Sequence, residues 1–219
     1  MVESHALIRT GRCSGRGRLL LFVAGTGWLA LVAAGLGVLY VYANAPGVPA
    51  RPPELWPSES RLLRETTKPT LVLAIHPLCP CSRASLAELA KLTAECGDGI
   101  RVFAVFASPE AFAAPLEQSG LWKTAGKIPG VRRFADYGGA ETRLFQAFTS
   151  GQALLYDPDG RLQFSGGITA NRGHAGDNVG RSAIVRFVRG DNPKRRESFV
   201  FGCPLPSPNP PTEGLCFRK

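Results

Sequence analysis

The stretch PTLVLAIHPLCPCSRASLAELAKL, residues 69–92, joins an apolar run to a helical pattern through two closely spaced cysteines. Residues 69–77, PTLVLAIHP, contain a continuous apolar run rich in branched side chains, which is typical of a strand buried on both faces. Residues 81–96 follow with the periodicity of an amphipathic helix. One face of that helix holds Leu86, Leu89, Ala90 and Thr93, and another holds Glu88, Lys91 and Glu95.

Cys79 and Cys81 are separated by Pro80 alone, so they cannot staple two distant elements together. We expect both thiols near the N-terminus of the helix, where unsatisfied N–H groups and the macrodipole favour negative charge. A lowered pKa yields the thiolate, which is the form that attacks a disulfide. The leading interpretation is thiol–disulfide exchange, in which Cys79 forms the mixed disulfide and Cys81 resolves it.

Four neighbours are expected to support this catalytic pair. His76 and Arg83 would add positive charge near the thiolate. Leu78 and Pro80 place apolar and rigid surface beside Cys79, which suits a site that meets another protein. Exchange between sulfurs needs no cofactor, and the partners would be thiols or disulfides of a client protein.

Beyond this stretch, strands alternate with helices, which indicates an α/β fold with a central mixed sheet flanked by helices. Pro158-Asp159-Gly160 lies between two apolar runs and predicts the turn of a β-hairpin. Further strands are expected at 100–108, 131–138, 152–157 and 161–167, and further helices at 109–120, 139–148 and 179–190.

The order of these elements around the cysteine motif resembles the thioredoxin-like superfamily. The most similar branch is the membrane-anchored, extracytoplasmic TlpA-like thiol–disulfide oxidoreductases, with a narrower similarity to the thioredoxin-like RedB group. The resemblance covers residues 66–190 and implies a thioredoxin-like fold with redox-active cysteines.

The chain departs from that family at two positions. The family pattern Cys-x-Pro-Cys falls on Leu78-Cys79-Pro80-Cys81, so that leucine occupies the nucleophile position and the thiol comes one residue later. The family also has a cis-proline before the hairpin, where this chain has Ser150 or Gly151. These differences put the docking of a substrate on that loop in doubt.

Residues 19–42 form an apolar segment without any charge. As a helix it would reach about 36 Å, enough to cross a hydrocarbon core of about 30 Å. Four arginines precede it and none follows until Arg51, so we expect a single-pass inner-membrane anchor with a cytoplasmic N-terminus and a periplasmic domain. A cleaved signal peptide is the alternative, since Ala43-Asn44-Ala45 has the form of a cleavage site.

The net charge of +9 is concentrated at the two ends of the chain, whereas residues 19–171 hold thirteen basic and twelve acidic side chains. A basic end beside an apolar segment is a topology signal, so no nucleic-acid partner is expected. The expected parts are a basic cytoplasmic N-terminus (1–18), the anchor (19–42), a Pro-rich spacer (43–65), the thioredoxin-like domain (66–190) and a Pro-rich basic tail (191–219).

Two other functions remain open. In the first, the domain binds and delivers copper, with Cys79 and Cys81 as soft ligands for Cu(I) and a histidine, His174 or His76, completing the site. His174 lies in a Gly-rich loop after the hairpin, which resembles the distant histidine of copper-delivery proteins of this fold. In the second, the domain is a non-catalytic binding module.

The remaining cysteines have different expected roles. Cys13 would stay inside the cell. Cys96 lies about 22 Å along the helix from Cys81, so we expect a buried, inert thiol. Cys203 and Cys216 are spaced for a small disulfide in the tail. The alternative is that Cys203, which lies in an apolar patch, folds back as a third redox partner.

Overall fold

The computed structural model describes residues 15–48, 51–108, 115–191 and 196–205. The chain divides into two compact units, with the boundary between Tyr42 and Ala43. We describe each unit by itself.

The described part of the N-terminal unit belongs to one helix, α1 (Gly15–Asn44). Its best 18-residue window has a mean hydropathy of 2.1 and none of that window is buried. Within the described residues, α1 is the one helix that is long and apolar enough to cross a membrane. The expected span of residues 19–42 lies inside it. By length and composition, both a membrane anchor and a signal sequence fit this helix.

The second unit is built on a five-stranded mixed sheet with the strand order β3-β2-β1-β4-β5. The central strand β1 pairs in parallel with β2, which pairs in parallel with β3, while β4 and β5 are antiparallel. The expected central mixed sheet and hairpin are thereby confirmed. The strands are β1 (Thr70–Ile75), β2 (Arg101–Ser108), β3 (Val131–Tyr137), β4 (Gln152–Tyr156) and β5 (Leu162–Gly167).

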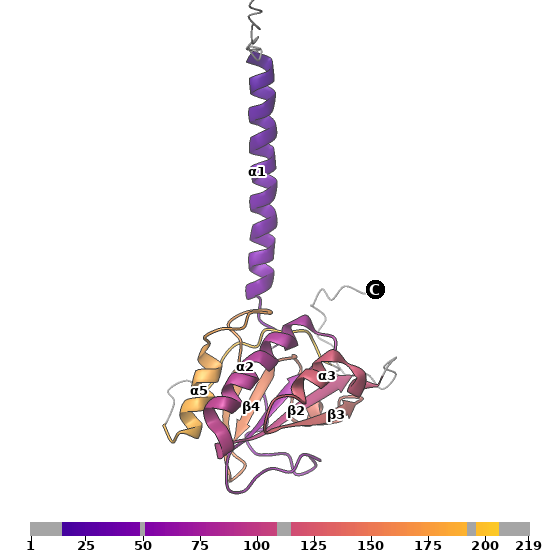
Figure 1. The fold of residues 1–219 in the computed structure, drawn as a ribbon, viewed down its shortest axis with the longest axis vertical. Coiled ribbons are helices and arrows are strands. Elements are labelled where there is room, and N and C mark those ends of the chain that lie inside the picture. Colours follow the sequence, from indigo (N-terminus) through magenta and orange to yellow (C-terminus); the bar gives the residue numbers. More distant parts are fainter. Residues whose placement is uncertain (1–14, 49–50, 109–114, 192–195, 206–219) are drawn as a thin grey trace, which may run out of the picture. The chain divides into compact units, whose positions relative to one another are not determined.

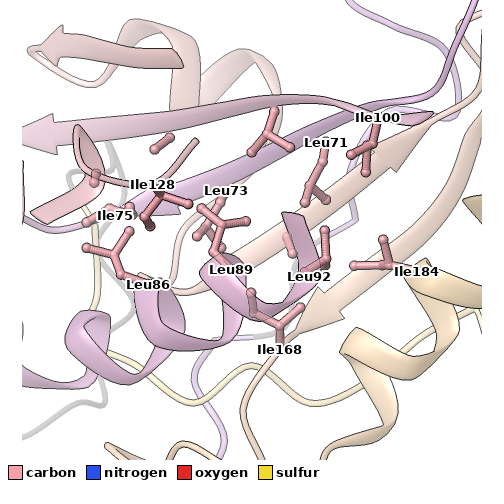
Figure 2. Close-up of a cluster of buried hydrophobic side chains, with 14 of the residues drawn as sticks. Leu71, Leu73, Ile75, Leu86, Leu89, Leu92, Ile100, Ile128, Ile168 and Ile184 are labelled. Carbon is pink, nitrogen blue, oxygen red and sulfur yellow. The ribbon is translucent and has the colours of Figure 1, made fainter. Parts of the chain in front are cut away.

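Alternate residues of β1 enter two separate cores, because side chains alternate across a strand. One core lies between the sheet and the helices α2 (Pro80–Cys96), α3 (Gly120–Ala125) and α5 (Val179–Val188) (Figure 1). Figure 2 shows the side chains of this core, with leucines of α2 facing those of β1. The labelled residues from these two elements are Leu71, Leu73, Ile75, Leu86, Leu89 and Leu92.

The opposite face of the sheet carries a smaller core around Val72 and Ala74. It is covered by the short helix α4 (Ala140–Leu144) with the following Phe145, and by residues from outside positions 66–190. The Trp56 ring meets Phe145 edge-on, with the ring centroids 4.9 Å apart. The other contributors to this core from outside that range are Leu62 and Leu205.

Described parts of both the spacer and the tail therefore pack on the sheet. The spacer reaches the edge strand β5, where the N–H of Leu162 donates to the carbonyl of Glu54 over 2.8 Å. The tail contacts the same strand, where the N–H of Ser165 donates to the backbone carbonyl of Arg196 over 3.0 Å. The domain limits of 66–190, expected from composition, leave these two packed segments out.

Two expectations about helices need correction. Part of the helix expected at 109–120 lies outside the described residues, and within its described part residues Leu116–Gln118 form a 3-10 turn before α3 begins. Glu88, expected on a polar face of α2, is completely buried. Its carboxylate pairs with Arg181 of α5 over 2.9 Å, and this partner explains why a charge is tolerated inside.

Candidate functional site

The cysteine pair sits where the central strand ends and α2 begins. Cys79 is the N-cap residue of α2, with an extended backbone (φ −78°, ψ 119°), and Pro80 occupies the first turn. Proline fits there because its missing N–H would be unsatisfied in any case. Cys81 follows within the same turn, so both thiols lie at the positive end of the helix dipole, as expected.

A third thiol reaches this point from the tail. The Sγ atoms of Cys79 and Cys203 lie 2.9 Å apart, and the Cys81 thiol interacts with both. All three are free thiols in this structure. Cys79 is 2% exposed and Cys81 is 8% exposed, so these two thiols are shielded from solvent, whereas Cys203 is partly exposed.

The pKa values of the three thiols are shifted in different directions. Hydrogen bonds from Cys203, and then from Cys81, lower the pKa of Cys79 far below its usual range, although burial opposes this. The same contact with Cys79 raises the pKa of Cys203. For Cys81, the bond with Cys203 lowers the pKa, but the bond with Cys79 and burial outweigh it, so the pKa is raised. Of the three thiols, Cys79 is therefore the one whose pKa is lowered.

His76 and Arg83 lie differently from the expectation. Burial lowers the pKa of His76, against the opposing effect of the Cys79 charge. The Nδ1 atom of His76 accepts a hydrogen bond from the N–H of Leu78 over 3.2 Å, so its ring orders the strand exit as a neutral group. Arg83 is exposed, and the arginine whose charge lowers the pKa of Cys81 is Arg172.

Ser150 lies before the hairpin, in the loop where the thioredoxin-like family has a cis-proline. The described residues contain no cis peptide bond. The Oγ atom of Ser150 accepts from the N–H of His76 over 2.8 Å and lies 2.6 Å from the Oγ atom of Ser82. Gly151 follows with a φ of +92°, a value that favours glycine. These contacts tie the loop to both ends of the cysteine motif.

The same loop holds the tail in place. The N–H of Ser150 donates to the carbonyl of Cys203 over 2.8 Å, and the N–H of Leu205 donates to Phe148 over 2.8 Å. Thr149 and Pro204 form an antiparallel bridge between them. The tail is thus paired with the loop as a short strand that carries Cys203 to Cys79.

A central β1 strand ends in a cysteine pair at the N-terminus of the following helix, and the sheet finishes in an antiparallel hairpin and a helix. The fold is thioredoxin-like. The resemblance read from the sequence is confirmed at this level.

Comparisons with known proteins agree on the fold. No family model matches the chain, and no curated protein matches it either. A hypothetical protein from Sinorhizobium meliloti 1021 has a TM-score of 0.55 at 22% identity, covering 74% of this chain and 93% of that one. An uncharacterized conserved protein from Geobacillus kaustophilus has a TM-score of 0.54 at 16% identity, covering 75% and 94%. Both similarities concern the fold alone.

A third similar structure is that of a named enzyme. It is a secreted disulfide oxidoreductase of Mycobacterium tuberculosis, homologous to DsbE of E. coli, with a TM-score of 0.40 at 13% identity, covering 57% of this chain and 83% of that one. At that TM-score the similarity carries no inference about function.

Neither histidine of the copper alternative, His174 or His76, belongs to a metal-binding group among the described side chains. In the parts of the chain that the structure describes, no three His, Cys, Asp or Glu side chains are arranged to hold a metal ion. The loop with His174 is fixed at Gly176, whose N–H donates to Glu88 over 3.0 Å. Glu88 lies about 10 Å along the axis of α2 beyond Cys81.

Several residues of the site give little signal in the sequence. Ser82 and Ser150 are small polar residues without a motif, and Arg172 lies far away in a polar loop. Gly202 directly precedes Cys203, and a Cβ atom there would lie 1.8 Å from the carbonyl oxygen of Ser150. In the sequence, the close approach of the tail to Ser150 is indicated only by a glycine that precedes a cysteine in an apolar patch.

Proposed function

We propose that this chain carries out thiol–disulfide exchange with client proteins through Cys79, outside the cytoplasm. The observation that carries the proposal is the Cys79 thiol at the N-cap of α2, with its sulfur 2.9 Å from the sulfur of Cys203. A low-pKa thiolate with a second thiol in contact has the parts that exchange needs, namely an attacking sulfur and a sulfur that releases the product.

The surroundings of Cys79 suit a protein client. Leu78 is 67% exposed and Pro80 is exposed beside a nearly buried nucleophile. An apolar, rigid rim favours contact with another polypeptide over contact with a small charged molecule. Exchange moves electrons between sulfurs, so no cofactor enters the proposed reaction.

We place the reaction on the extracytoplasmic side of a membrane. The proposal rests on α1 and on the arginines that precede the apolar segment, because positive residues are retained on the cytoplasmic side. An oxidising compartment also suits a protein whose site collects three thiols. In this arrangement residues 19–42 anchor the chain in the inner membrane and the domain faces the periplasm.

A turnover assay on the full chain in detergent micelles tests the proposal. The substrate is a cysteine peptide joined to glutathione by a mixed disulfide, and dithiothreitol supplies the electrons. We expect the chain to accelerate release of glutathione, and Cys79→Ser to abolish the acceleration. Cys96→Ser is the matched control, since burial raises the pKa of Cys96 to about 11 and this thiol lies at the far end of α2. Acceleration that persists in Cys79→Ser would show that the site lies elsewhere, and a chain that gives no acceleration would refute the proposal and favour a non-catalytic binding module.

A further inference from the structure

The Cys79 sulfur has little room for a client sulfur to approach it. This thiolate is 2% exposed and in direct contact with Cys203. Disulfide exchange requires a client sulfur to approach the attacking sulfur directly. The client cannot do so while Cys203 occupies that contact, so the segment that carries Cys203 has to move during the reaction.

That segment is held by contacts suited to reversible docking. Its backbone pairs with the loop at Phe148–Ser150 through the two hydrogen bonds described above, and the side chain of Leu205 is buried at 5% exposure. The carbonyl of Gly202 also accepts from Nη1 of Arg172 over 2.6 Å. Each hydrogen bond contributes only modestly to stability, so the docked state is defined but can open.

The three thiols are not equivalent as resolving groups. Cys81 is fixed in the first turn of α2, separated from Cys79 by Pro80 alone, and a disulfide between them would close a small ring. Cys203 comes from a separate segment, 124 residues away in sequence, and its sulfur approaches Cys79 without such a ring. Disulfide geometry constrains both the Cα separation and the Cβ directions, which favours the pair from two segments.

We propose that Cys203 is the resolving cysteine of this protein, and that residues 202–205 undock to admit the client and return to release it. The proposal rests on the function proposed above, and it assigns to Cys203 the step that the sequence motif assigned to Cys81.

The reaction balances in two steps. The Cys79 thiolate attacks a client disulfide, forms a mixed disulfide with one client sulfur and expels the other as a thiolate. Cys203 then gives its proton to that expelled thiolate, attacks Cys79 and expels the first client sulfur. The client disulfide gains two electrons, and the two cysteines become a Cys79–Cys203 disulfide. An external dithiol reverses the oxidation by the same exchange.

The ionisation state of Cys79 influences when Cys203 can attack in the second step. The hydrogen bond with the Cys79 sulfur is the largest cause of the raised pKa of Cys203, and the negative charge of Cys79 adds to it. Once Cys79 is in a mixed disulfide its negative charge is gone, and that cause disappears. Cys203 then becomes easier to deprotonate at the moment when its attack is needed.

A single-turnover experiment separates the two candidate resolving groups. The full reduced chain in detergent carries serine at Cys13, Cys96 and Cys216, so that three thiols remain. It is mixed with one equivalent of 5,5′-dithiobis(2-nitrobenzoate), whose released thionitrobenzoate is measured by absorbance. Attack by Cys79 releases the first equivalent, and resolution releases the second.

We expect the second release to persist in Cys81→Ser and to be lost, or slowed at least about tenfold, in Cys203→Ser. A stable mixed disulfide on Cys79 should then appear by mass spectrometry. The opposite pattern, with the second release lost only in Cys81→Ser, overturns the proposal and leaves the proposed function intact. Loss of both releases only in Cys79→Ser supports the proposed function separately, and their persistence there refutes it.

Gly202→Ala tests docking while keeping every thiol. The added Cβ would meet the carbonyl oxygen of Ser150 at 1.8 Å, so the tail should undock. Gly120→Ala is the matched control, because nothing lies within 4 Å of its Cβ. We expect Gly202→Ala to speed the first release and slow the second, and Gly120→Ala to change neither. Unchanged kinetics in Gly202→Ala, with the fold intact by circular dichroism, would contradict the proposal.

Discussion

The sulfur of Cys79 lies 2.9 Å from the sulfur of Cys203, although 124 residues separate them in the sequence. The contact depends on the last described segment of the chain returning to the N-terminus of α2. Cys81, the expected partner in the motif, interacts with both sulfurs. A site that appears local in the sequence is therefore completed by the tail.

The ionisation of Cys79 predicts a measurable thiolate at neutral pH. Because the pKa of Cys79 is lowered far below its usual range, the reduced chain should keep thiolate absorbance at 240 nm down to pH 5. Cys79→Ser should remove that absorbance. An unperturbed cysteine has a pKa of about 8.5 and would lose it below pH 7. Thiolate absorbance that rises only above pH 8 in the unsubstituted chain would contradict the assignment.

The same shift makes stability depend on pH. A lowered native pKa adds stability above the unfolded-state pKa, and this stability is lost as pH falls through the interval below it. Cys81 and Cys203, whose pKa values are raised, stay protonated in both states below pH 8. Between pH 8 and 5 the reduced chain should lose up to about 1.4 kcal/mol per pH unit relative to Cys79→Ser in urea unfolding. A parallel pH dependence of the two proteins would count against the shift.

Glu88 should contribute strongly to stability. Its buried carboxylate pairs with Arg181 and accepts hydrogen bonds from the N–H of Gly176 and from Asn178. Glu88→Ala leaves the largely buried Arg181 without this partner, so we expect a loss of about 3 kcal/mol in urea unfolding. Glu95→Ala, which removes a more exposed partner of the same arginine, should cost less than about 1 kcal/mol. Equal losses would show that burial of Glu88 has no energetic consequence.

His174 separates disulfide exchange from copper delivery. The histidine belongs to no metal-binding group among the described side chains, so His174→Ala should leave exchange within about threefold of the unsubstituted rate. The reduced chain should also bind Cu(I) no more tightly than a simple dithiol, measured against a competing chelator. Tight one-to-one binding that His174→Ala destroys would favour the copper function, since loss of one of about three ligands weakens a site severely.

The membrane topology is tested by a reporter fused after Lys219. The arginines before the apolar segment 19–42 predict that the fusion point lies outside the cytoplasm. A reporter that functions only in the periplasm should therefore be active, and one that functions only in the cytoplasm should be silent. Activity of the cytoplasmic reporter would reverse the topology. Retention of the fusion in the membrane fraction distinguishes the anchor from a cleaved signal peptide.

The framework of the domain could be predicted because local patterns carry it. The apolar run of β1 and the periodicity of α2 can each be recognised within a single segment of the sequence. Pro158-Asp159-Gly160 specifies the hairpin turn in the same local way. These signals were sufficient for the mixed sheet and for the position of the cysteine pair.

The missed features depend on contacts between distant segments. Glu88 follows the polar side of a helical pattern, and its contacts with Arg181, Gly176 and Asn178 make its burial tolerable. The sequence is compatible with a disulfide between Cys203 and Cys216 and with a redox role of Cys203 beside Cys79 and Cys81, and it does not distinguish the two. Cys216 lies outside the described residues. Three-dimensional pairing of the tail with the loop at Ser150 brings Cys203 to Cys79.

The most direct test of the central claim is the redox equilibrium of Cys79 itself. The full chain with serine at Cys13, Cys96 and Cys216 is equilibrated in glutathione buffers of graded potential, trapped with N-ethylmaleimide and weighed by mass spectrometry. The account predicts one two-electron transition from three alkylated thiols to one alkylated thiol and a disulfide, absent in Cys79→Ser. A Cys79 that stays alkylated across the whole series, or a transition that survives in Cys79→Ser, would contradict it.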